Sequence, residues 1–334
     1  MTYFDVISIS EEFLIPFIKN KYNLDGYIIL PLQSHEGGRN AVFICEGENA
    51  PGMVARVSYQ NDRSKEDYLA ELEFVRYLYD NGASVSNVIS SKEGNLIEET
   101  EYDNQILFVA LFEKAKGKQL AENNYCYREG VPLSEYFFNT GKTLGKIHQL
   151  SKEYQPKYKR YHFADKYNME YIERLLPDSL SPIKDRISEI LEDLDKIEKT
   201  KEVYGMVHFD YSDGNYHIDF ENGDITVYDF DNCCHAWYMY DLAELWIHGE
   251  GWIMFEEDPQ KRKQLMDAYF AEILKGYRTE TTLDDAMVAK LSLFVQANRI
   301  ENLVDAFEVE KSTGENYLDD EDLEEISKCI LGEK

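Results

Sequence analysis

Residues 207–231 constrain this chain more than any other stretch, because a loop of polar side chains leads directly into a predicted β-hairpin. The loop reads VHFDYSDGN. The hairpin, YHIDFENGDITVYDF, alternates apolar and polar residues on either side of an Asn-Gly pair, which is a strong signal for a tight turn. A tight hairpin brings its two ends together, so the side-chain oxygens of Asn215 and Asp229 are expected to converge. Asp231 adds a further carboxylate.

This arrangement of residues suits one kind of chemistry. Amide and carboxylate oxygens are ligands that Mg²⁺ prefers, and the ion keeps its other positions for water and phosphate oxygens. Asp210, five residues before Asn215, can accept a proton from a substrate hydroxyl without binding the metal. The set therefore favours phosphoryl transfer. A solvated acidic loop is the alternative for the spacing alone, and His208, the hairpin and the second acidic cluster weaken it.

The first 113 residues predict a five-stranded antiparallel sheet with a helix inserted after its third strand. An amphipathic helix comes first, and glycine turns separate the early strands. In chain order the elements are a helix at 8–23, strands at 27–33, 41–47 and 53–59, a helix at 64–83, and strands at 95–99 and 105–113. For the first helix, Ser10 before two glutamates is the candidate N-cap.

The rest of the chain is predicted to be mostly helical, apart from the hairpin. Residues 114–120 indicate a linker. The predicted helices span about 133–153, 183–200, 236–249, 259–277, 283–310 and 318–331, with ends uncertain by a few residues.

Composition excludes several classes of protein. Acidic residues outnumber basic ones by 64 to 35, and a formal charge of −29 argues against nucleic acid or an anionic membrane surface as partner. Solubility and attraction of cationic ligands both remain as interpretations. Five cysteines without a CxxC pair indicate reduced thiols rather than disulfides or a zinc site. No signal peptide and no run of about 18 apolar residues is found, so a cytoplasmic location is expected.

These motifs make the chain resemble the aminoglycoside phosphotransferase and choline kinase-like family, whose members are relatives of protein kinases. The HxDxxxxN loop of the family is matched by His208, Asp210 and Asn215, and its metal-binding aspartate by Asp229. The resemblance extends from about residue 25 to residue 307. It implies an α+β, bilobal, protein-kinase-like fold. An antiparallel-sheet lobe at 1–115 would bind nucleotide, and a mostly helical lobe at 116–334 would carry the catalytic and acceptor sites.

The resemblance also implies roles for single residues. Asp210 would be the catalytic base, His208 would brace the loop, and Asn215 with Asp229 would hold Mg²⁺. Asp241, in the YDLAE segment, would form hydrogen bonds to the catalytic loop.

Two residues depart from the pattern. Phe209 stands where many members have glycine, and Asp231 stands where protein kinases have the glycine of their DFG motif. An acidic residue is common there among small-molecule kinases, so contact of Asp231 with a metal or with substrate is left open.

A kinase needs a basic side chain on the third strand to hold phosphate oxygens. In MVARV that residue is Arg56, and arginine at this place is familiar in the family. An acid on the next helix should pair with it. LAELEF offers Glu71 and Glu73 on different faces, and Glu71 fits the family position better.

Other features of a nucleotide site are less specific. Gly37 and Gly38, in EGGRN, would let the backbone approach phosphates closely, although any hairpin turn uses such a pair. Backbone groups at 112–115 would contact adenine. The GKT at 141–143 is not a P-loop, because the glycine that such a loop needs five positions earlier is Tyr136.

We therefore predict an ATP-dependent, Mg²⁺-dependent kinase that phosphorylates a hydroxyl of an aminoglycoside, an amino alcohol such as homoserine or choline, or a sugar. Residues 231–257 hold all three tryptophans together with Glu244 and Glu250, which suits a cationic acceptor or ordinary core packing. The alternatives are a protein-serine kinase and a non-catalytic binding or coat protein that kept the fold. Loss of Asp210, Asn215 or Asp229 would mark the latter, and all three are present.

Overall fold

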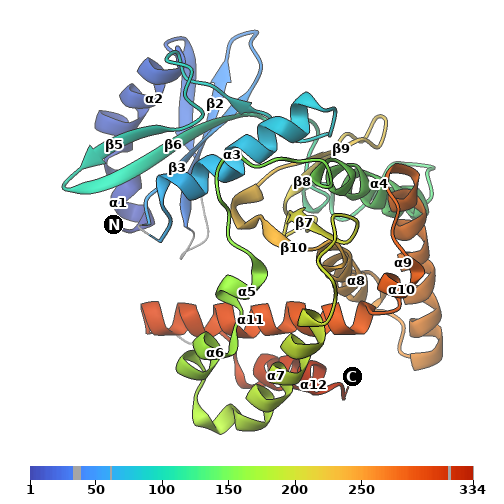
Figure 1. Cartoon of the computed structure of the whole chain (residues 1–334). Coiled ribbons are helices and arrows are strands. Elements are labelled where there is room, and N and C mark those ends of the chain that lie inside the picture. Colours follow the sequence, from blue (N-terminus) through green and yellow to red (C-terminus); the bar gives the residue numbers. More distant parts are fainter. Residues whose placement is uncertain (33–38, 61, 315–316, 334) are drawn as a thin grey trace. The chain divides into compact units, whose positions relative to one another are not determined.

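The computed structural model describes residues 1–32, 39–60, 62–314 and 317–333 (Figure 1). By its internal contacts the chain divides into two compact units. The first unit comprises Met1–Glu129, Tyr154–Arg160 and Asp213–Asp231, and the second comprises Gly130–Glu153, Tyr161–Ser212 and Asn232–Lys334. The hairpin therefore belongs with the N-terminal residues.

A six-stranded antiparallel sheet forms the centre of the first unit (Figure 1). Its strands are β1 Tyr27–Pro31, β2 Asn40–Gly47, β3 Met53–Ser58, β4 Val88–Ile89, β5 Glu98–Tyr102 and β6 Gln105–Glu113. They lie in the order β1-β2-β3-β6-β4, and β5 also pairs with β6. The five predicted strands are present, with ends shifted by up to three residues. The sixth strand, β4, is only two residues long and too short to show an alternating pattern.

The N-terminal helix begins earlier than the sequence predicted. It consists of α1 Tyr3–Ser8, a π-helical turn η1 Ser10–Leu14, and α2 Ile15–Tyr22. Thr2 caps α1 in a capping box with Asp5, whereas Ser10 donates its hydroxyl to the carbonyl of Ile7 and caps nothing. The cap prediction at Ser10 was wrong because a capped helix already existed seven residues upstream. Helix α3, Lys65–Asp80, is capped by Ser64.

The two faces of the sheet have different neighbours. Side chains that alternate inward along β2, β3 and β6 pack against α1 and α2 in one apolar core. These inward residues include Ala41, Phe43, Cys45, Ala55, Val57, Leu107, Val109 and Leu111. The opposite face is covered over β6 and β4 by α3, through Tyr68 and Leu72. Over β1 this face is open, because Ile28 and Leu30 are exposed.

The predicted hairpin is present, and a third extended segment pairs with its first strand. Strands β8 Tyr216–Ile218 and β9 Ile225–Val227 pair antiparallel, with positive φ at Gly223 in the turn. Residues 114–120, predicted as a linker, lie along β8, where Lys118 and Ile218 exchange two backbone hydrogen bonds. Gly117 has φ +84°, and a Cβ there would come within 2.0 Å of the Ile218 carbonyl oxygen. A turn η2 Ala121–Asn123 follows.

The second unit is mostly helical. Its helices are α4 Leu133–Ser151, α5 Phe163–Lys166, α6 Met169–Leu175, α7 Ser181–Asp195, α8 Met239–Ile253, α9 Pro259–Glu280, α10 Asp285–Val288, α11 Leu291–Thr313 and α12 Asp320–Leu331. Two antiparallel strands, β7 Tyr204–Val207 and β10 Cys234–Trp237, and the 3₁₀ turns η3 Asp178–Leu180 and η4 Phe230–Asn232 complete the described elements. The sequence pattern missed the short α5 and α6 and merged α10 with α11.

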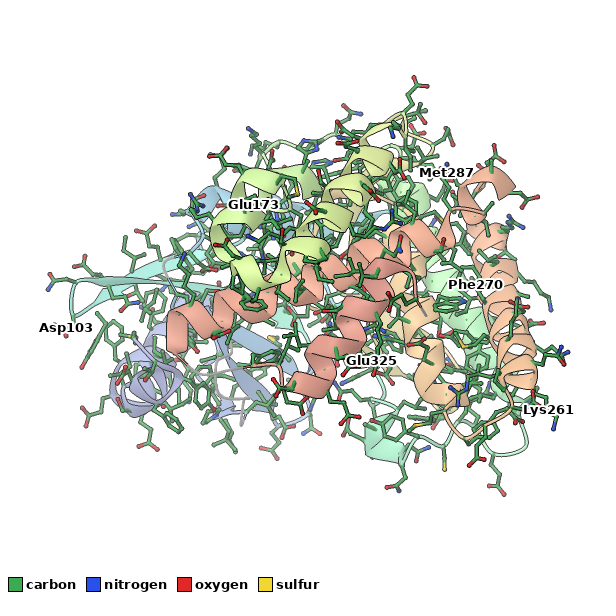
Figure 2. The ribbon with its side chains drawn as sticks, turned by 90° about the horizontal axis from the view of Figure 1, so that it is seen from below. Asp103, Glu173, Lys261, Phe270, Met287 and Glu325 are labelled. Carbon is green, nitrogen blue, oxygen red and sulfur yellow. The ribbon has the colours of Figure 1, made fainter. Side chains whose placement is uncertain are left out.

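Long helices meet inside this unit. Figure 2, in which Glu173 marks α6 and Glu325 marks α12, shows α6, α7 and α12 beside α11.

None of the helices in the described ranges combines the length and apolar composition that a membrane span requires.

Helices α4 and α9 touch through glycines. A Cβ added to Gly141 would lie 2.0 Å from the carbonyl oxygen of Ile273, and one added to Gly276 would lie 1.9 Å from that of Phe138. The backbones of the two helices are therefore in direct contact. The GKT segment lies inside α4, so the prediction that it is no P-loop is confirmed.

This contact makes a stability prediction. We expect Gly276→Ala to lower the free energy of unfolding by about 1–3 kcal/mol, because the new methyl group cannot fit against Phe138 without moving a helix. Gly251→Ala is the control, since it is helical with nothing within 4 Å of an added Cβ, and should be neutral or stabilising by about 0.5–1 kcal/mol. Denaturant unfolding measures both, and equal effects would contradict the interpretation.

Candidate active site

The open part of the sheet in the first unit carries a row of apolar side chains. Leu30, Ile44, Val54 and Phe112 are direct partners across β1, β2, β3 and β6, so they share one face. Leu30 is 61% exposed, which leaves that end of the row accessible. Arg56 lies on the same face two residues after Val54, and its guanidinium carbon is 5.3 Å from the Phe112 ring centroid. The face thus offers a flat apolar surface beside a cation.

Arg56 forms a bidentate ion pair with Glu71 of α3. Both terminal nitrogens lie 2.7 Å from the two carboxylate oxygens, and the two side chains are only 7% and 1% exposed. The predicted pairing is confirmed. Glu73 faces elsewhere, where it accepts bonds from the Tyr154 hydroxyl and the Lys157 amide. The pair fixes α3 relative to β3.

Asp229 lies next to this pair. Its Oδ1 is 4.0 Å from Nη1 of Arg56, and its side chain is 49% exposed. Asp229 also has φ +60°, which only a few non-glycine residues adopt. An accessible carboxylate is therefore held beside the buried cation.

Asp231 is enclosed by guanidinium groups. Arg63 contacts both its carboxylate and its carbonyl oxygen, and Arg160 contacts the carbonyl oxygen. Nη1 of Arg39 is 3.6 Å from Oδ2, and Nη1 of Arg56 is 3.9 Å from Oδ1. Burial acts to raise the pKa of Asp231, but these positive charges outweigh it and lower the pKa below its ordinary value.

This group of arginines could not be predicted from the sequence. They come from the residue before β2, from β3, from the segment before α3 and from residues 154–160, and no local motif marks their convergence.

Asn215 lies at the other end of the hairpin from Asp229. Its carbonyl oxygen accepts the amide of Tyr228, the residue before Asp229, at 2.9 Å. Gln119 and the Tyr228 hydroxyl both donate to the carbonyl of Gly214 at 2.7 and 2.9 Å, which fixes the entry to β8. The two predicted metal ligands therefore flank a hairpin whose ends are bonded to each other.

The donor set fits Mg²⁺. Asn215 and Asp229 offer one amide and one carboxylate, both hard oxygen donors. Within the described residues, no group of three or more His, Cys, Asp or Glu side chains could hold a metal. A two-ligand protein site that leaves positions for water and phosphate is the kind that Mg²⁺ uses.

In the second unit, the loop that carries Asp210 is held by its own amides. The amides of His208 and Phe209 each donate to Asp241 at 2.9 Å, and that of Tyr211 donates to Glu244 at 3.0 Å. The amide of Asp210 donates to Nδ1 of His208 at 3.3 Å. The predicted hydrogen bonds from Asp241 to the loop are confirmed. Because Asp241 and Glu244 lie one turn apart on α8, a single helix binds three of the four consecutive amides at 208–211.

Asp241 also joins the loop to α4 and α9. Nε2 of His148 lies 3.0 Å from Asp241 Oδ2, and Nδ1 of the same ring lies 3.0 Å from the Tyr277 hydroxyl. All three side chains are fully buried. Burial lowers the pKa of His148, so the ring is neutral at pH 7.

Phe209, the departure from glycine, has φ +71°. Its ring stacks on Tyr240 at 4.3 Å with an interplanar angle of 7°. A left-handed backbone costs a bulky residue about 1–2 kcal/mol. This stacking and the hydrogen bond from the Phe209 amide to Asp241 offset that cost, which explains how phenylalanine is tolerated here.

Two further carboxylates lie near Asp210 within this unit. Burial, followed by the charge of Asp210, raises the pKa of Glu244 well above its usual range. Burial also raises the pKa of Glu301 on α11 well above that range, with the charges of Asp305 and Asp210 adding to it. Tyr240 donates its hydroxyl to Glu301. The surroundings of Asp210 are therefore strongly acidic.

The other candidates for the acceptor site have structural partners. Trp237 is buried and packs against Phe294, whereas Trp252 packs against Tyr136. Glu250 forms an ion pair with Arg299 at 3.3 Å. Gly37 and Gly38 lie outside the described residues.

An antiparallel sheet with a buried Arg–Glu pair, and a helical unit with an anchored His-x-Asp loop, are the parts of a protein-kinase-like fold. A profile of the phosphotransferase enzyme family (APH) matches residues 32–280. The chain belongs to this family, and it is an enzyme of the kinase type.

Individual relatives agree with this assignment. The chain is 24% identical over 261 residues to amicoumacin kinase of Bacillus subtilis (strain 168), covering 77% of this chain and 74% of that protein. The solved structure of amicoumacin kinase hAmiN, in complex with AMP-PNP, Ca²⁺ and Ami, superposes with TM-score 0.79 at 23% identity, over 96% of this chain and 92% of that one. A microcompartment-associated aminopropanol kinase gives TM-score 0.70 at 18% identity, over 96% and 95%. These likenesses establish the fold.

The buried ion pair makes a second prediction. Glu71→Ala leaves the Arg56 charge buried without its main partner, so we expect it to lower the free energy of unfolding by about 3–5 kcal/mol. Glu99→Ala, which breaks an exposed pair with Lys65, should cost less than about 1 kcal/mol. Chemical denaturation measures both, and a Glu71 variant as stable as the Glu99 variant would contradict the prediction.

Proposed function

We propose that this enzyme transfers the γ-phosphate of ATP, with Mg²⁺, to a hydroxyl of a small molecule. The observation that carries the proposal is the buried pair of Arg56 and Glu71 with the accessible carboxylate of Asp229 beside it. A relative of the same fold is described with AMP-PNP and a divalent metal, and two relatives are named as kinases of small molecules.

The first unit would hold the nucleotide. The apolar row that ends at Leu30 suits the base, and residues 112–115 would contact it through backbone groups. Arg56 would hold phosphate oxygens. In this proposal residues 1–115 form the nucleotide lobe, and 116–334 the catalytic and acceptor lobe, with the hairpin contributing from the latter part of the sequence.

Asn215 and Asp229 would hold Mg²⁺, which would neutralise the charge that develops on the phosphate oxygens. Asp210 would accept the proton of the acceptor hydroxyl as that oxygen bonds to the γ-phosphorus and ADP leaves. The four side-chain bonds to the loop amides keep the Asp210 carboxylate in one place, so little reorganisation is needed during the reaction.

An amine-bearing alcohol is the acceptor class that we propose. Glu244 and Glu301 lie close enough to Asp210 for its charge to shift their pKa values. An ammonium group would allow such carboxylates to ionise together, whereas a neutral sugar would not. The formal charge of −29 would draw a cation toward the protein.

The catalytic base provides the main test. We expect Asp210→Asn to reduce kcat by a factor of about 10² to 10⁴, with ATP affinity little changed, because only proton transfer is lost. Asp224→Asn, an equal change in the exposed hairpin turn, should leave kcat unaltered. A screen with labelled ATP over amino alcohols, aminoglycosides, sugars and a generic protein supplies the acceptor. Turnover within threefold of wild type would rule out the role of Asp210.

The acceptor class has its own pH test. Ionisation of a carboxyl whose pKa is raised occurs only as the pH rises through that pKa, so a cationic acceptor should bind more tightly with increasing pH while its amine stays protonated. The measured quantity is the ratio of kcat/KM for an amine-bearing acceptor to that for its N-acetyl form, because effects of Asp210 cancel. Glu301→Gln should flatten the rise, and Glu310→Gln on the same helix should not. Equal use of both acceptors would contradict the class.

A further inference from the structure

Four of the eleven arginines in the chain meet at one residue of the first unit. The four are Arg39, Arg56, Arg63 and Arg160. Their meeting point is Asp231, two residues after the proposed metal ligand Asp229. Such a concentration of positive charge is unusual in a chain with 64 acidic and 35 basic residues.

The contacts show how tightly Asp231 is enclosed. Its side chain is 9% exposed, and Oδ2 accepts from Nδ2 of Asn40 at 3.3 Å as well as facing Arg39. Arg63 reaches its carboxylate and its carbonyl through one nitrogen, Nη1. A divalent cation at this carboxylate would have to enter among several guanidinium groups, which Coulomb repulsion opposes.

Phosphate binding needs more than Arg56. Both terminal nitrogens of Arg56 are bonded to Glu71, so much of its charge is already compensated. ATP remains an anion when Mg²⁺ is bound, and a chain of charge −29 repels it at long range. Additional cations near the phosphates would overcome this repulsion, and Arg63, with an 11% exposed side chain, is held by Asp231, two residues after Asp229.

We propose that Asp231 is a positioning residue rather than a metal ligand, and that it holds Arg63 to bind the phosphate chain of the nucleotide. This proposal rests on the function proposed above. It assigns a phosphate-binding role to the segment 62–64 before α3, which no motif in the sequence marks. Arg39, whose Nε lies 2.8 Å from Asp62 of the same segment, would strengthen the site.

The test compares nucleotides that differ only in their phosphates. Calorimetry gives the affinity of the purified protein for ATP and AMP, with Mg²⁺ and with EDTA. Arg63→Gln should lower the affinity for ATP by about tenfold to a hundredfold, which corresponds to the loss of a charge-assisted hydrogen bond. Its affinity for AMP should fall by less than about threefold. The loss should be similar with and without metal. Arg63→Lys should recover part of it, and Arg128→Gln, an arginine that contacts the hairpin turn of the same unit at Glu221, should match wild type.

A double-mutant cycle tests the part played by Asp231. If Asp231 acts through Arg63, Asp231→Asn should also lower the affinity for ATP. The affinity of the double variant should then equal that of Arg63→Gln within about threefold. ATP binding by Asp231→Asn that equals or exceeds wild type would overturn the proposal. So would multiplicative losses in the double variant, or a loss that excess Mg²⁺ repairs, because these indicate a metal ligand.

Failure of the proposed function would look different. Wild-type protein that binds neither ATP nor AMP would remove the nucleotide site altogether. If the wild-type protein binds ATP more tightly than AMP, and Arg63→Gln shows the same preference, only the present inference is overturned. The KM for ATP should rise in Arg63→Gln more than kcat falls, which a general loss of structure would not produce.

Discussion

The ion pair of Arg56 and Glu71 is the contact on which the rest of the first unit depends. Two buried charges are stable only while both hydrogen bonds of this bidentate pair keep their geometry, because each charge has lost its hydration. Strand β3 and helix α3 therefore cannot shift independently. The same guanidinium faces Asp229 and Asp231, so one contact sets the positions of the sheet, the helix and the chain that follows the hairpin.

The second unit uses a single carboxylate for a similar purpose. Asp241 accepts hydrogen bonds from the amides of His208 and Phe209 and pairs with the ring of His148, and all of these groups are buried. Removal of water makes each of these hydrogen bonds stronger and makes any alternative arrangement costly. The loop around Asp210 is thus defined by α8, while Phe209 accepts an unfavourable backbone conformation to satisfy it.

Local signals explain what could be predicted from the sequence. The Asn-Gly turn and the alternation of β2, β3 and β6 act over a few residues, so the hairpin and most strands could be inferred. The pairing of Arg56 with Glu71 was predicted from the family resemblance, because Glu71 and Glu73 were both available on the helix. The enclosure of Asp231 could not, because Arg39 and Arg63 lie more than 160 residues away in the sequence. Short elements such as β4 and α5 also escaped, since two to four residues show no periodicity.

The glycine contact between α4 and α9 has a consequence for how such an enzyme can diversify. Where two helix backbones touch, every side chain larger than a hydrogen atom is excluded, so Gly141 and Gly276 have no freedom to drift. Selection for a new acceptor cannot act through these positions without separating the helices. If the acceptor binds as proposed, changes in acceptor preference would instead arise through side chains of α8 and α11, the helices that carry Glu244 and Glu301.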